Sequence, residues 1–367
     1  MLLVYDNLIR IGAITAFLFS ALCTGKGDEL EDRSARSDPK EQGAIQRLGL
    51  ALGEALDVEY THDGFCSVAI SDGVGMDAAI PLLNDVRSCR SLTIAGGDLT
   101  DQGLATLNEI DGLLSLDISH TQIVGSAFSE LRNLSSLRRL LLTGDQLDGG
   151  KLSGLKHLQE LGEALLIIAR GGDEVIDTLG CLQSLRALEL RAPDLTGATF
   201  HHFGNGSRIE ELRLVQCSVK EGFSELKRLP LRSLSIEGAQ LDDNAAVHLA
   251  AITTLERLFV GKTKIGDEGV AALGKIESLR ALDVSDTLVT PAFLDSIVSF
   301  PHLKQLAVGG VNLSDTDVAK LAQLERLELL LADEVTLSES QADMVRLALP
   351  DCHVHVRSST SRREDQN

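Results

Sequence analysis

The sequence predicts an α/β solenoid built from a short repeated unit, and three observations lead to this prediction. One apolar pattern, apolar-x-x-apolar-x-apolar, recurs along most of the 367-residue chain. Hydrophobic residues make up 44% of the chain but aromatic residues only 3%, with no Trp, so small aliphatic side chains in repetitive packing must form the core. A helix-like spacing follows each apolar pattern, which indicates one strand and one short helix per unit.

Twelve copies of the apolar pattern can be aligned, beginning at residue 65. Consecutive copies start 24 residues apart, except for a step of 22 after residue 209 and a last step of 21 after residue 303. Leu158 competes with Leu161 as the start of the fifth copy, and the period favours Leu161. The residues expected to be buried are Phe65, Val68, Ile70; Cys89, Leu92, Ile94; Leu113, Leu116, Ile118; Leu137, Leu140, Leu142; Leu161, Ala164, Leu166; Leu185, Leu188, Leu190; Ile209, Leu212, Leu214; Leu231, Leu234, Ile236; Leu255, Leu258, Val260; Leu279, Leu282, Val284; Leu303, Leu306, Val308; and Leu324, Leu327, Leu329.

Each copy is expected to form a short strand with one buried face, because side chains alternate between the two faces of a strand. One such unit cannot cover its own apolar side, so neighbouring units must stack and bury a continuous core. The second half of each unit shows helical spacing, as in Val270 and Leu273. Residues suited to begin a helix precede these segments: Asp77, Thr100-Asp101, Asp242-Asp243, Gly266-Asp267, Ser314-Asp315 and Thr290-Pro291.

On this pattern the chain resembles the leucine-rich repeat family, most closely its ribonuclease-inhibitor-like and cysteine-containing types. The segments TKIGDEGVAAL, GDLTDQGLATL and VNLSDTDVAKL are similar to the loop-and-helix half of repeats in secreted bacterial members. The resemblance covers residues 65 to about 356. It implies a right-handed horseshoe of about twelve repeats, with a parallel sheet on the concave face and short helices on the convex face. Because this family is a binding scaffold, it also implies a non-enzymatic protein-binding function.

The chain departs from the family at the position eight residues after the start of each copy. Many members carry Asn or Cys there, whereas this chain has varied residues, so we expect no continuous side-chain ladder at this position. Thr121, Thr263 and Thr287 occupy it in three copies, and we expect their hydroxyl groups to bond neighbouring backbone.

The two ends of the chain differ from the repeats in composition. Ile11 to Leu22 carry no charge and are too short to cross a bilayer, which predicts a signal peptide at residues 1–23; the alternative is a buried cap helix. Leu22 disfavours acylation of Cys23. The remaining predicted divisions are a disordered polar linker at 24–43, an N-terminal helical cap at 44–64, the repeats at 65–337, a C-terminal cap at 338–356 and a disordered tail at 357–367.

Three short motifs were considered as chemical sites, and the repeat frame explains each of them. Gly261-Lys262-Thr263 ends like a phosphate-binding loop, but Glu256 stands where that loop needs its first glycine. The segment SDGVGMDAA has the glycine spacing of a dinucleotide site but also fits a repeat turn. His353, His355 and Cys352 are too few for a metal site. We expect no cofactor, metal or catalytic residue.

Charge and cysteine content narrow the classes of partner. A net charge of −20 disfavours nucleic acid and anionic membrane, which are bound through clustered Lys and Arg. The six cysteines are scattered and do not indicate a disulfide framework. We expect no small-molecule substrate and no membrane span. The expected partner is an unidentified protein.

The strand residues between the buried ones offer the expected binding surface, a strip on the order of 550 Å². Leu141, Leu165 and Ile167 are apolar where solvent is expected, and charged residues surround them, which is the composition of a protein-binding site. A shifted frame that buries some of these residues is the alternative. The expected partner-binding residues are Arg139, Leu141, Leu165, Ile167, Glu189, Arg191, Arg213, Arg257 and Phe259.

Two functions remain open at this point. The first is an exported, periplasmic or cell-surface scaffold that binds a protein through the concave face. The second is a cytoplasmic regulatory or inhibitor-type protein of the same fold, in which the apolar N-terminal segment belongs to a cap.

Overall fold

A computed structural model describes residues 38–107, 110, 112–204, 206–333 and 335–357. The predicted signal peptide, residues 24–37 of the predicted linker and residues 358–367 of the predicted tail lie outside the described residues. The chain divides into two compact units, Met1–Leu188 (unit 1) and Glu189–Asn367 (unit 2). No helix in the described ranges is both long and apolar enough to cross a membrane.

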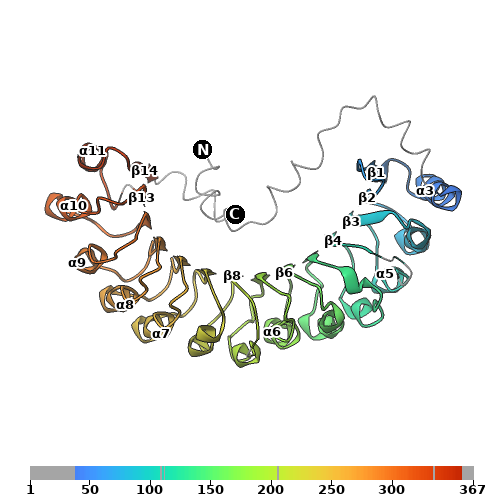
Figure 1. Cartoon of the computed structure of the whole chain (residues 1–367), viewed down its shortest axis with the longest axis horizontal. Helices are drawn as coiled ribbons and strands as arrows, with labels where there is room; N and C mark the ends of the chain where they lie inside the picture. Colours follow the sequence, from blue (N-terminus) through green and yellow to red (C-terminus); the bar gives the residue numbers. More distant parts are fainter. Residues whose placement is uncertain (1–37, 108–109, 111, 205, 334, 358–367) are drawn as a thin grey trace. The chain divides into compact units, whose positions relative to one another are not determined.

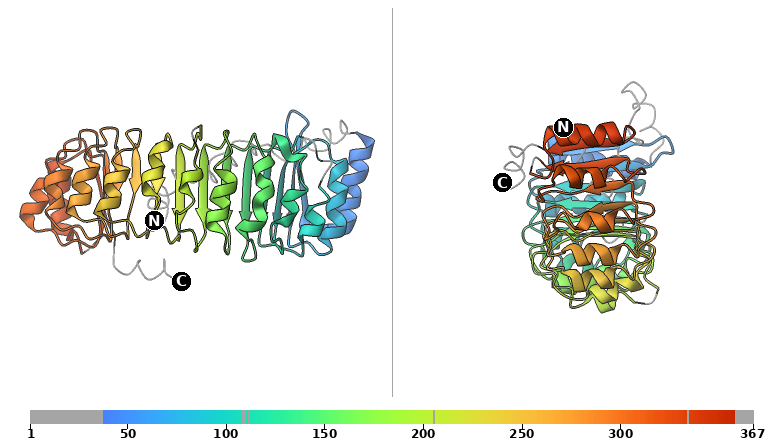
Figure 2. Two further views of the ribbon diagram at one scale, coloured as in Figure 1. Left: turned by 90° about the horizontal axis from the view of Figure 1, so that it is seen from below. Right: turned by 90° about the vertical axis from the view of Figure 1, so that its left-hand side faces the viewer.

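Unit 1 consists of strands that follow one another in chain order in the sheet (Figures 1 and 2). A short turn connects β1 to β2, and helical segments connect the later strands. All neighbouring pairs from β2 to β6 are parallel, whereas β1 pairs with β2 in the antiparallel direction. The strands are β1 (Leu56–Tyr60), β2 (Cys66–Ser71), β3 (Cys89–Ala95), β4 (Ser115–Ser119), β5 (Arg139–Thr143) and β6 (Glu163–Ile167), and β7 (Ala187–Arg191) spans the unit boundary. The helices are α3 (Pro39–Leu52), α4 (Met76–Ala79), α5 (Asp101–Leu104) and α6 (Gly172–Leu179), with 3₁₀ helices η2 (Gly53–Ala55), η3 (Ile80–Asp85), η4 (Ser126–Ser129), η5 (Leu134–Ser136) and η6 (Gly149–His157).

Unit 2 has the same organisation, and its neighbouring strands from β8 to β14 are all parallel. The strands are β8 (Glu211–Val215), β9 (Ser233–Ser235), β10 (Arg257–Phe259), β11 (Ala281–Asp283), β12 (Gln305–Ala307), β13 (Leu329–Asp333) and β14 (His353–Arg357). The helices are α7 (Asp243–Leu249), α8 (Asp267–Leu273), α9 (Phe293–Ile297), α10 (Asp315–Leu321) and α11 (Glu339–Ala348), with 3₁₀ helices η7 (Phe200–His202) and η8 (Phe223–Arg228).

The core of each unit lies between the strands and the helices. Along β5 the burial alternates, so that Leu140 and Leu142 are buried while Leu141 and Thr143 are half-buried on the opposite face. The helices contribute their own apolar side, for example Val270 and other residues of α8. We call the side of the strands that faces away from the helices the strand face. In β5 and β6 the side chains on this face are half-buried. This arrangement confirms the predicted α/β repeat solenoid.

Strand pairing decides the frame of the fifth copy. Ala164 and Leu166 of β6 pair with Leu140 and Leu142 of β5, so the copy starts at Leu161 as the period predicted. The alternative frame from Leu158 is thereby excluded. Leu165 and Ile167 are consequently half-buried on the strand face and do not belong to the core.

The prediction for the first copy is wrong only at its first residue, because Val68 and Ile70 are buried and pair with Leu92 and Ile94 as predicted. A bulge between Cys66 and Ser67 shifts the register, so that Cys66 pairs with Cys89. Cys66 is therefore buried, whereas Phe65 remains 39% exposed. The ring of Phe65 lies under the Arg90 guanidinium, whose carbon is 4.2 Å from the ring centroid.

The predicted frame of the last copy is wrong by three residues. Leu306 of β12 pairs with Leu330, so the 24-residue spacing continues through β13. The repeat positions are Leu327, Leu330 and Ala332, all of which are buried. Of the predicted residues, Leu324 and Leu327 are buried, whereas Leu329 is half-buried. The strand face here carries Leu329, Leu331 and Asp333 in place of the predicted Arg326, Glu328 and Leu330. The local sequence is so rich in leucine that apolar spacing alone fits both frames.

Aspartate side chains at the start of four helices connect consecutive repeats. Each carboxylate accepts hydrogen bonds from backbone N–H groups 23 to 26 residues further along the chain, near the start of the next helical segment. Helix N–H groups there have no partner within their own helix, so these bonds satisfy them. The four inter-repeat aspartates are Asp77, Asp101, Asp243 and Asp267.

Asp77 illustrates how this role differs from the predicted one. The sequence predicts that Asp77 caps its own helix, but α4 begins after Gly75 with no side-chain cap. The Asp77 carboxylate instead accepts hydrogen bonds from the N–H of Thr100 at 2.9 Å and from its hydroxyl at 2.6 Å, in the next repeat. A side-chain ladder therefore exists, at a position other than the turn position of the family.

The predicted helix starts are observed in most repeats. Thr100, Asp242 and Ser314 cap α5, α7 and α10 with their side chains, and Ser314 forms a full capping box with Asp317. Gly266 precedes α8 without a side-chain bond. The helix expected from Pro291 begins at Phe293.

The N-terminal cap begins earlier than the sequence predicted and is only partly helical. Helix α3 starts at Pro39, inside the predicted linker, because Asp38 accepts a hydrogen bond from the Lys40 N–H and proline suits the first helical position. Residues 56–60, expected to belong to a helical cap, form β1 and extend the sheet. At the other end, α11 and β14 lie at the predicted C-terminal cap, and β14 continues to Arg357.

Candidate functional site

The unit 1 part of the predicted site is an aliphatic cluster on the strand face. Leu141 of β5 lies directly beside Leu165 of β6, and Thr143 lies beside Ile167 in the same pairing. All four side chains are half-buried. Because these side chains lie on the side of the sheet that faces away from the core, this cluster offers apolar area that the core does not use.

Asp117 lies beside this cluster and was not among the predicted site residues. It pairs with Leu141 across β4 and β5. Its Oδ1 atom is buried and has no hydrogen-bond partner within the described part of the chain. Burial raises the pKa of the Asp117 carboxyl above its ordinary value, and the positive charge of Arg139 opposes this rise. A buried acceptor without a partner is costly, so this oxygen is suited to a donor from a ligand.

Arg139 belongs to an ion pair on the same face. Its Nε atom lies 4.0 Å from Glu163 Oε2 on β6, and both side chains are partly exposed. Arg139, which was expected to contact a partner protein, thus already lies beside the carboxylate of Glu163. Exposed pairs of this kind contribute less than about 1 kcal/mol to stability, so Arg139 remains able to exchange its partner.

The unit 2 part of the predicted site consists of charged residues. Arg213 NH1 of β8 lies 3.5 Å from Glu189 Oε2 of β7. Arg257 NH2 of β10 lies 2.9 Å from Glu211 Oε1 of β8, two repeats away. Glu189, Arg213 and Arg257 belong to the predicted site residues, whereas Glu211 does not. The two ion pairs connect adjacent strands in the first case and strands two repeats apart in the second.

Arg191 and Phe259 complete the predicted residues of unit 2. The Nε atom of Arg191 in β7 is buried and has no hydrogen-bond partner among the described residues. Phe259 is half-buried in β10, between Ser235 of β9 and Asp283 of β11. One large ring between two small polar residues leaves an aromatic surface at the centre of these strands.

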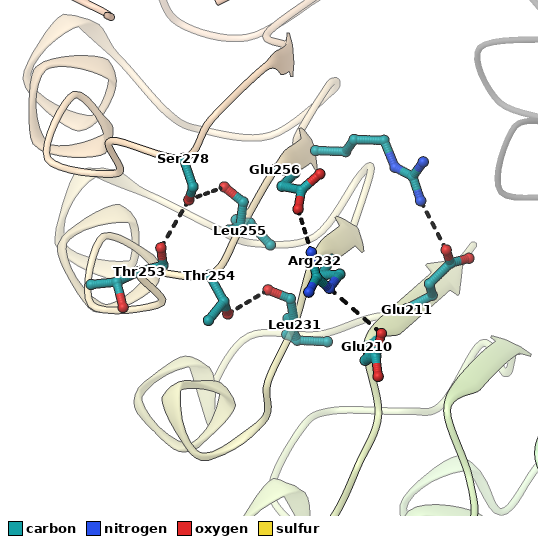
Figure 3. Close-up of polar contacts among 10 residues, drawn as sticks. Glu210, Glu211, Leu231, Arg232, Thr253, Thr254, Leu255, Glu256 and Ser278 are labelled. Carbon is teal, nitrogen blue, oxygen red and sulfur yellow. Dashed lines mark hydrogen bonds and ion pairs between the residues drawn. The ribbon is translucent and has the colours of Figure 1, made fainter. Parts of the chain in front are cut away.

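A second row of charges runs along the strand starts of unit 2 (Figure 3). Arg232 lies between two acidic residues, with its Nε 3.6 Å from Glu210 and its NH1 2.6 Å from Glu256. Thr254 and Ser278 fix the turns beside them by donating to carbonyl oxygens of the preceding repeat. These three charges alternate in sign, and Arg232 offsets one of the two acidic charges, so they form a rim with a net charge of −1.

A buried carboxyl group, that of Asp283, and a half-buried one, that of Glu237, lie on the strand face of unit 2. Burial raises the pKa of Asp283 above 3.8, although the N–H of Ser285 donates to it at 2.8 Å. Burial also raises the pKa of Glu237, and the negative charge of Asp283 adds to this rise. Both groups therefore take up a proton more readily than an ordinary surface carboxyl group.

The structure also shows what the phosphate-like motifs do. Lys262 has a φ of 58°, as a tight turn requires, and the Thr263 hydroxyl donates to Val260 O at 2.7 Å. This is the backbone contact predicted for Thr263, and Thr287 makes the same contact with Val284 O. Gly261-Lys262-Thr263 is thus a repeat turn.

The glycines near residue 75 belong to the same kind of turn. The N–H groups of Gly75 and Met76 donate to Asp98 of the next repeat, at 2.7 and 2.9 Å. A phosphate group would need these N–H groups, which already have an acidic partner. His353 and His355 are exposed on β14, and no group of three or more His, Cys, Asp or Glu in the described ranges is placed to hold a metal ion.

The solved structure of an internalin has a similar architecture. No protein-family model and no curated protein matches the sequence. An internalin, InlF, of Listeria monocytogenes is similar in structure, with 18% identity and a TM-score of 0.57 over 87% of this chain and 91% of that chain. A leucine-rich repeat protein of Leptospira interrogans gives 16% identity and a TM-score of 0.41 over 75% and 80% of the two chains. The plant peptide hormone receptor RGFR1, solved in complex with RGF2, gives 14% and 0.42 over 75% and 52%.

The repeat spacing, the strand pairing and the similarity to the internalin structure define the chain as a leucine-rich repeat protein by its fold. At this level of identity the likeness describes architecture. Function must therefore be argued from the residues of the strand face.

Proposed function

We propose that the chain is a non-enzymatic scaffold that binds another protein through its strand face. The observation that carries this proposal is the aliphatic cluster of Leu141, Leu165 and Ile167 beside the unpartnered carboxylate oxygen of Asp117. An apolar surface with an adjacent buried acceptor suits a partner that presents an aliphatic side chain and a nearby N–H or cationic group.

The unit 2 residues support the same function by a different chemistry. Arg213 and Arg257 are half-buried in pairs with Glu189 and Glu211, and Arg191 has a buried Nε atom without a hydrogen-bond partner among the described residues. Arginine and aromatic side chains are enriched where protein partners bind, and Phe259 supplies the aromatic group. The charged residues among them favour a partner of complementary charge and fix its orientation.

Site-specific photo-cross-linking in the host tests this proposal. A photoreactive amino acid placed at Leu165 should cross-link to one distinct protein. The matched control places it at Val247, which is 53% exposed on α7 and far from the strand face. Leu141→Glu should remove the cross-link from position 165 by placing a charge in the cluster, whereas Leu288→Glu, at a residue that is 65% exposed outside the strands, should not. Equal labelling from 165 and 247 would contradict the proposal.

We further propose that the chain is exported and acts outside the cytoplasm, with residues 1–23 removed. The support for this is the uncharged segment Ile11 to Leu22, which has the length of a signal-peptide core. A cytoplasmic regulator of the same fold is the alternative. Mass spectrometry of the N-terminal peptide from the native host separates the two, because export predicts a start near Thr24 and the alternative predicts an intact Met1.

A further inference from the structure

Cys66 and Cys89 form a buried pair of thiols at the junction of the N-terminal cap with the first repeats. They are register partners in the adjacent strands β2 and β3. Cys66 is 1% exposed and Cys89 is fully buried. Both are reduced in the described part of the chain. Neighbouring strands are about 4.8 Å apart, which lies within the Cα separation of roughly 4.4 to 6.8 Å that a disulfide spans.

The surroundings of Cys66 are polar, although the site is buried. The Ser88 hydroxyl lies 3.3 Å from the Cys66 sulfur and also contacts the Glu41 carboxylate of α3. Glu41 is only 4% exposed and accepts a second hydrogen bond, from the Ser88 N–H, at 3.3 Å. The Ser88 hydroxyl can therefore donate to the Cys66 sulfur, which stabilises a thiolate there, or to the Glu41 carboxylate.

The two sulfur atoms differ in character. A hydrogen bond from the Cys89 thiol lowers the pKa of Cys66, and Ser88 and the positive charge of Arg90 act in the same direction. Burial and the negative charge of Glu41 oppose them, and the net effect is a lowered pKa. The pKa of Cys89 is raised well above its ordinary value by its interaction with Cys66 and by burial. Cys66 is thus the better nucleophile, and Cys89 is placed to react second.

We propose that Cys66 and Cys89 form a redox site that small disulfide compounds convert to a disulfide, which links β2 to β3. The Cys66 thiolate attacks one sulfur of the oxidant, forms a mixed disulfide and releases one thiol. Cys89 then loses its proton and attacks the Cys66 sulfur, which forms the protein disulfide and releases the second thiol. One molecule of oxidant is reduced to two thiols as the two cysteines are oxidised, so electrons and protons balance.

Access to this buried pair requires the cap helix α3 to move away. Two ion pairs to Asp85 hold that helix, from Lys40 at 2.8 Å and from Arg47 at 3.3 Å. All three side chains are partly exposed, so these ion pairs are weak. Local opening of the cap must also expose the buried Ala44, Leu48 and Leu52 of α3. The disulfide would then restrain the end of the array, which has no further strand beyond β1 in the described residues.

The test exposes the full-length chain to oxidised glutathione, followed by alkylation in urea and peptide mapping by mass spectrometry. The expected result is a linked peptide pair containing Cys66 and Cys89, with the loss of two hydrogen atoms. Cys181 is exposed and serves as the internal control, because it should form a glutathione adduct under the same conditions. Unmodified Cys66 and Cys89 beside a fully modified Cys181 would overturn the proposal, as would separate glutathione adducts on both residues.

Two single variants test the order of the steps. Cys89→Ala should trap glutathione on Cys66, whereas Cys66→Ala should leave Cys89 unmodified; the reverse pattern would overturn the assignment of the nucleophile. Asp85→Asn should increase the rate of disulfide formation several-fold by loosening α3, and an unchanged rate would contradict the opening step. Far-UV circular dichroism checks that each variant is folded. The peptide mapping of the chain without substitutions does not depend on any variant.

Discussion

The inter-repeat aspartates predict a specific energetic coupling between Asp243 and Gly269. The Asp243 carboxylate accepts hydrogen bonds from the N–H of Gly266 at 2.7 Å and of Gly269 at 3.0 Å, which joins α7 to the start of α8. A Cβ atom at Gly269 would lie 2.4 Å from Asp243 Oδ1, so an alanine there must displace the carboxylate. Asp243→Ala leaves both N–H groups without this acceptor and should cost about 2 to 4 kcal/mol.

The double variant separates this contact from general effects. Gly269→Ala alone should destabilise by about 1 to 3 kcal/mol, since the lost hydrogen bonds outweigh the gain of about 1 kcal/mol from alanine in a helix. In the Asp243→Ala background the carboxylate is gone, so the same change should be nearly neutral. The remaining neighbours, at 3.1 Å for Ile265 and 3.3 Å for Ala246, need only small shifts. The expected coupling energy is about 2 kcal/mol.

Urea unfolding followed by far-UV circular dichroism measures these energies, because the chain has no Trp for fluorescence. Gly103 and Asp77 provide the matched control. A Cβ atom at Gly103 would lie 2.7 Å from the Asp77 Cα, so removing the Asp77 side chain cannot relieve that clash. Gly103→Ala should therefore stay destabilising in an Asp77→Ala background. Additive effects of Asp243→Ala and Gly269→Ala would refute the reasoning.

Three further outcomes are expected. Thr263→Val should destabilise by about 1 kcal/mol in urea unfolding, because Val260 O loses its hydroxyl donor; a neutral effect would contradict this. Burial raises the pKa of Asp283, so the neutral carboxyl group contributes stability. This contribution is complete below pH 3.8 and is lost as the pH rises through the pKa of the folded state. The urea midpoint should fall as pH rises above about 4, less steeply in Asp283→Asn, and equal slopes would refute the assignment. Arg257→Ala should change stability by less than about 1 kcal/mol despite its 2.9 Å contact with Glu211.

The repeat architecture could be predicted from the sequence because its period is regular. The choice of Leu161 over Leu158 rested on the 24-residue step, and strand pairing confirms it. The same step would have placed the last copy correctly, but five leucines between 324 and 331 allow a second frame that apolar spacing alone cannot exclude. The bulge at Cys66 depends on how the first repeat meets the cap, which no spacing rule contains.

The aspartate ladder was visible in the sequence but was interpreted differently. Asp77 and Asp101 stand 24 residues apart, as do Asp243 and Asp267, and a helix start explains each of them locally. Their bonds to the next repeat require knowledge of how successive helices stack. The sequence signal for these inter-repeat bonds was a Gly two residues after an aspartate, as in Asp267-Glu268-Gly269. Only a residue without a Cβ atom at position 269 allows the carboxylate of Asp243, in the preceding repeat, to approach.

The strand-face residues could be predicted from the alternation of side chains, but their partners could not. Arg257 contacts Glu211 two repeats away, a separation that a single column of residues does not reveal. The unpartnered oxygen of Asp117 depends on the packing of its neighbours, and only coordinates show it. The strand face could thus be located from the sequence, whereas only the structure shows that the buried Asp117 Oδ1 atom on it is a hydrogen-bond acceptor without a partner among the described residues.

The central claim is tested most directly by measuring affinity. The partner that the cross-linking identifies is purified without the cross-link, and its Kd is measured for the unaltered chain and for its variants. If the strand face binds this partner, Leu165→Glu should raise Kd by at least about tenfold, because a charge replaces an apolar contact at the centre of the cluster. Val247→Glu on α7 should leave Kd unchanged. Equal affinity of the Leu165→Glu variant and the unaltered chain would contradict binding through the strand face.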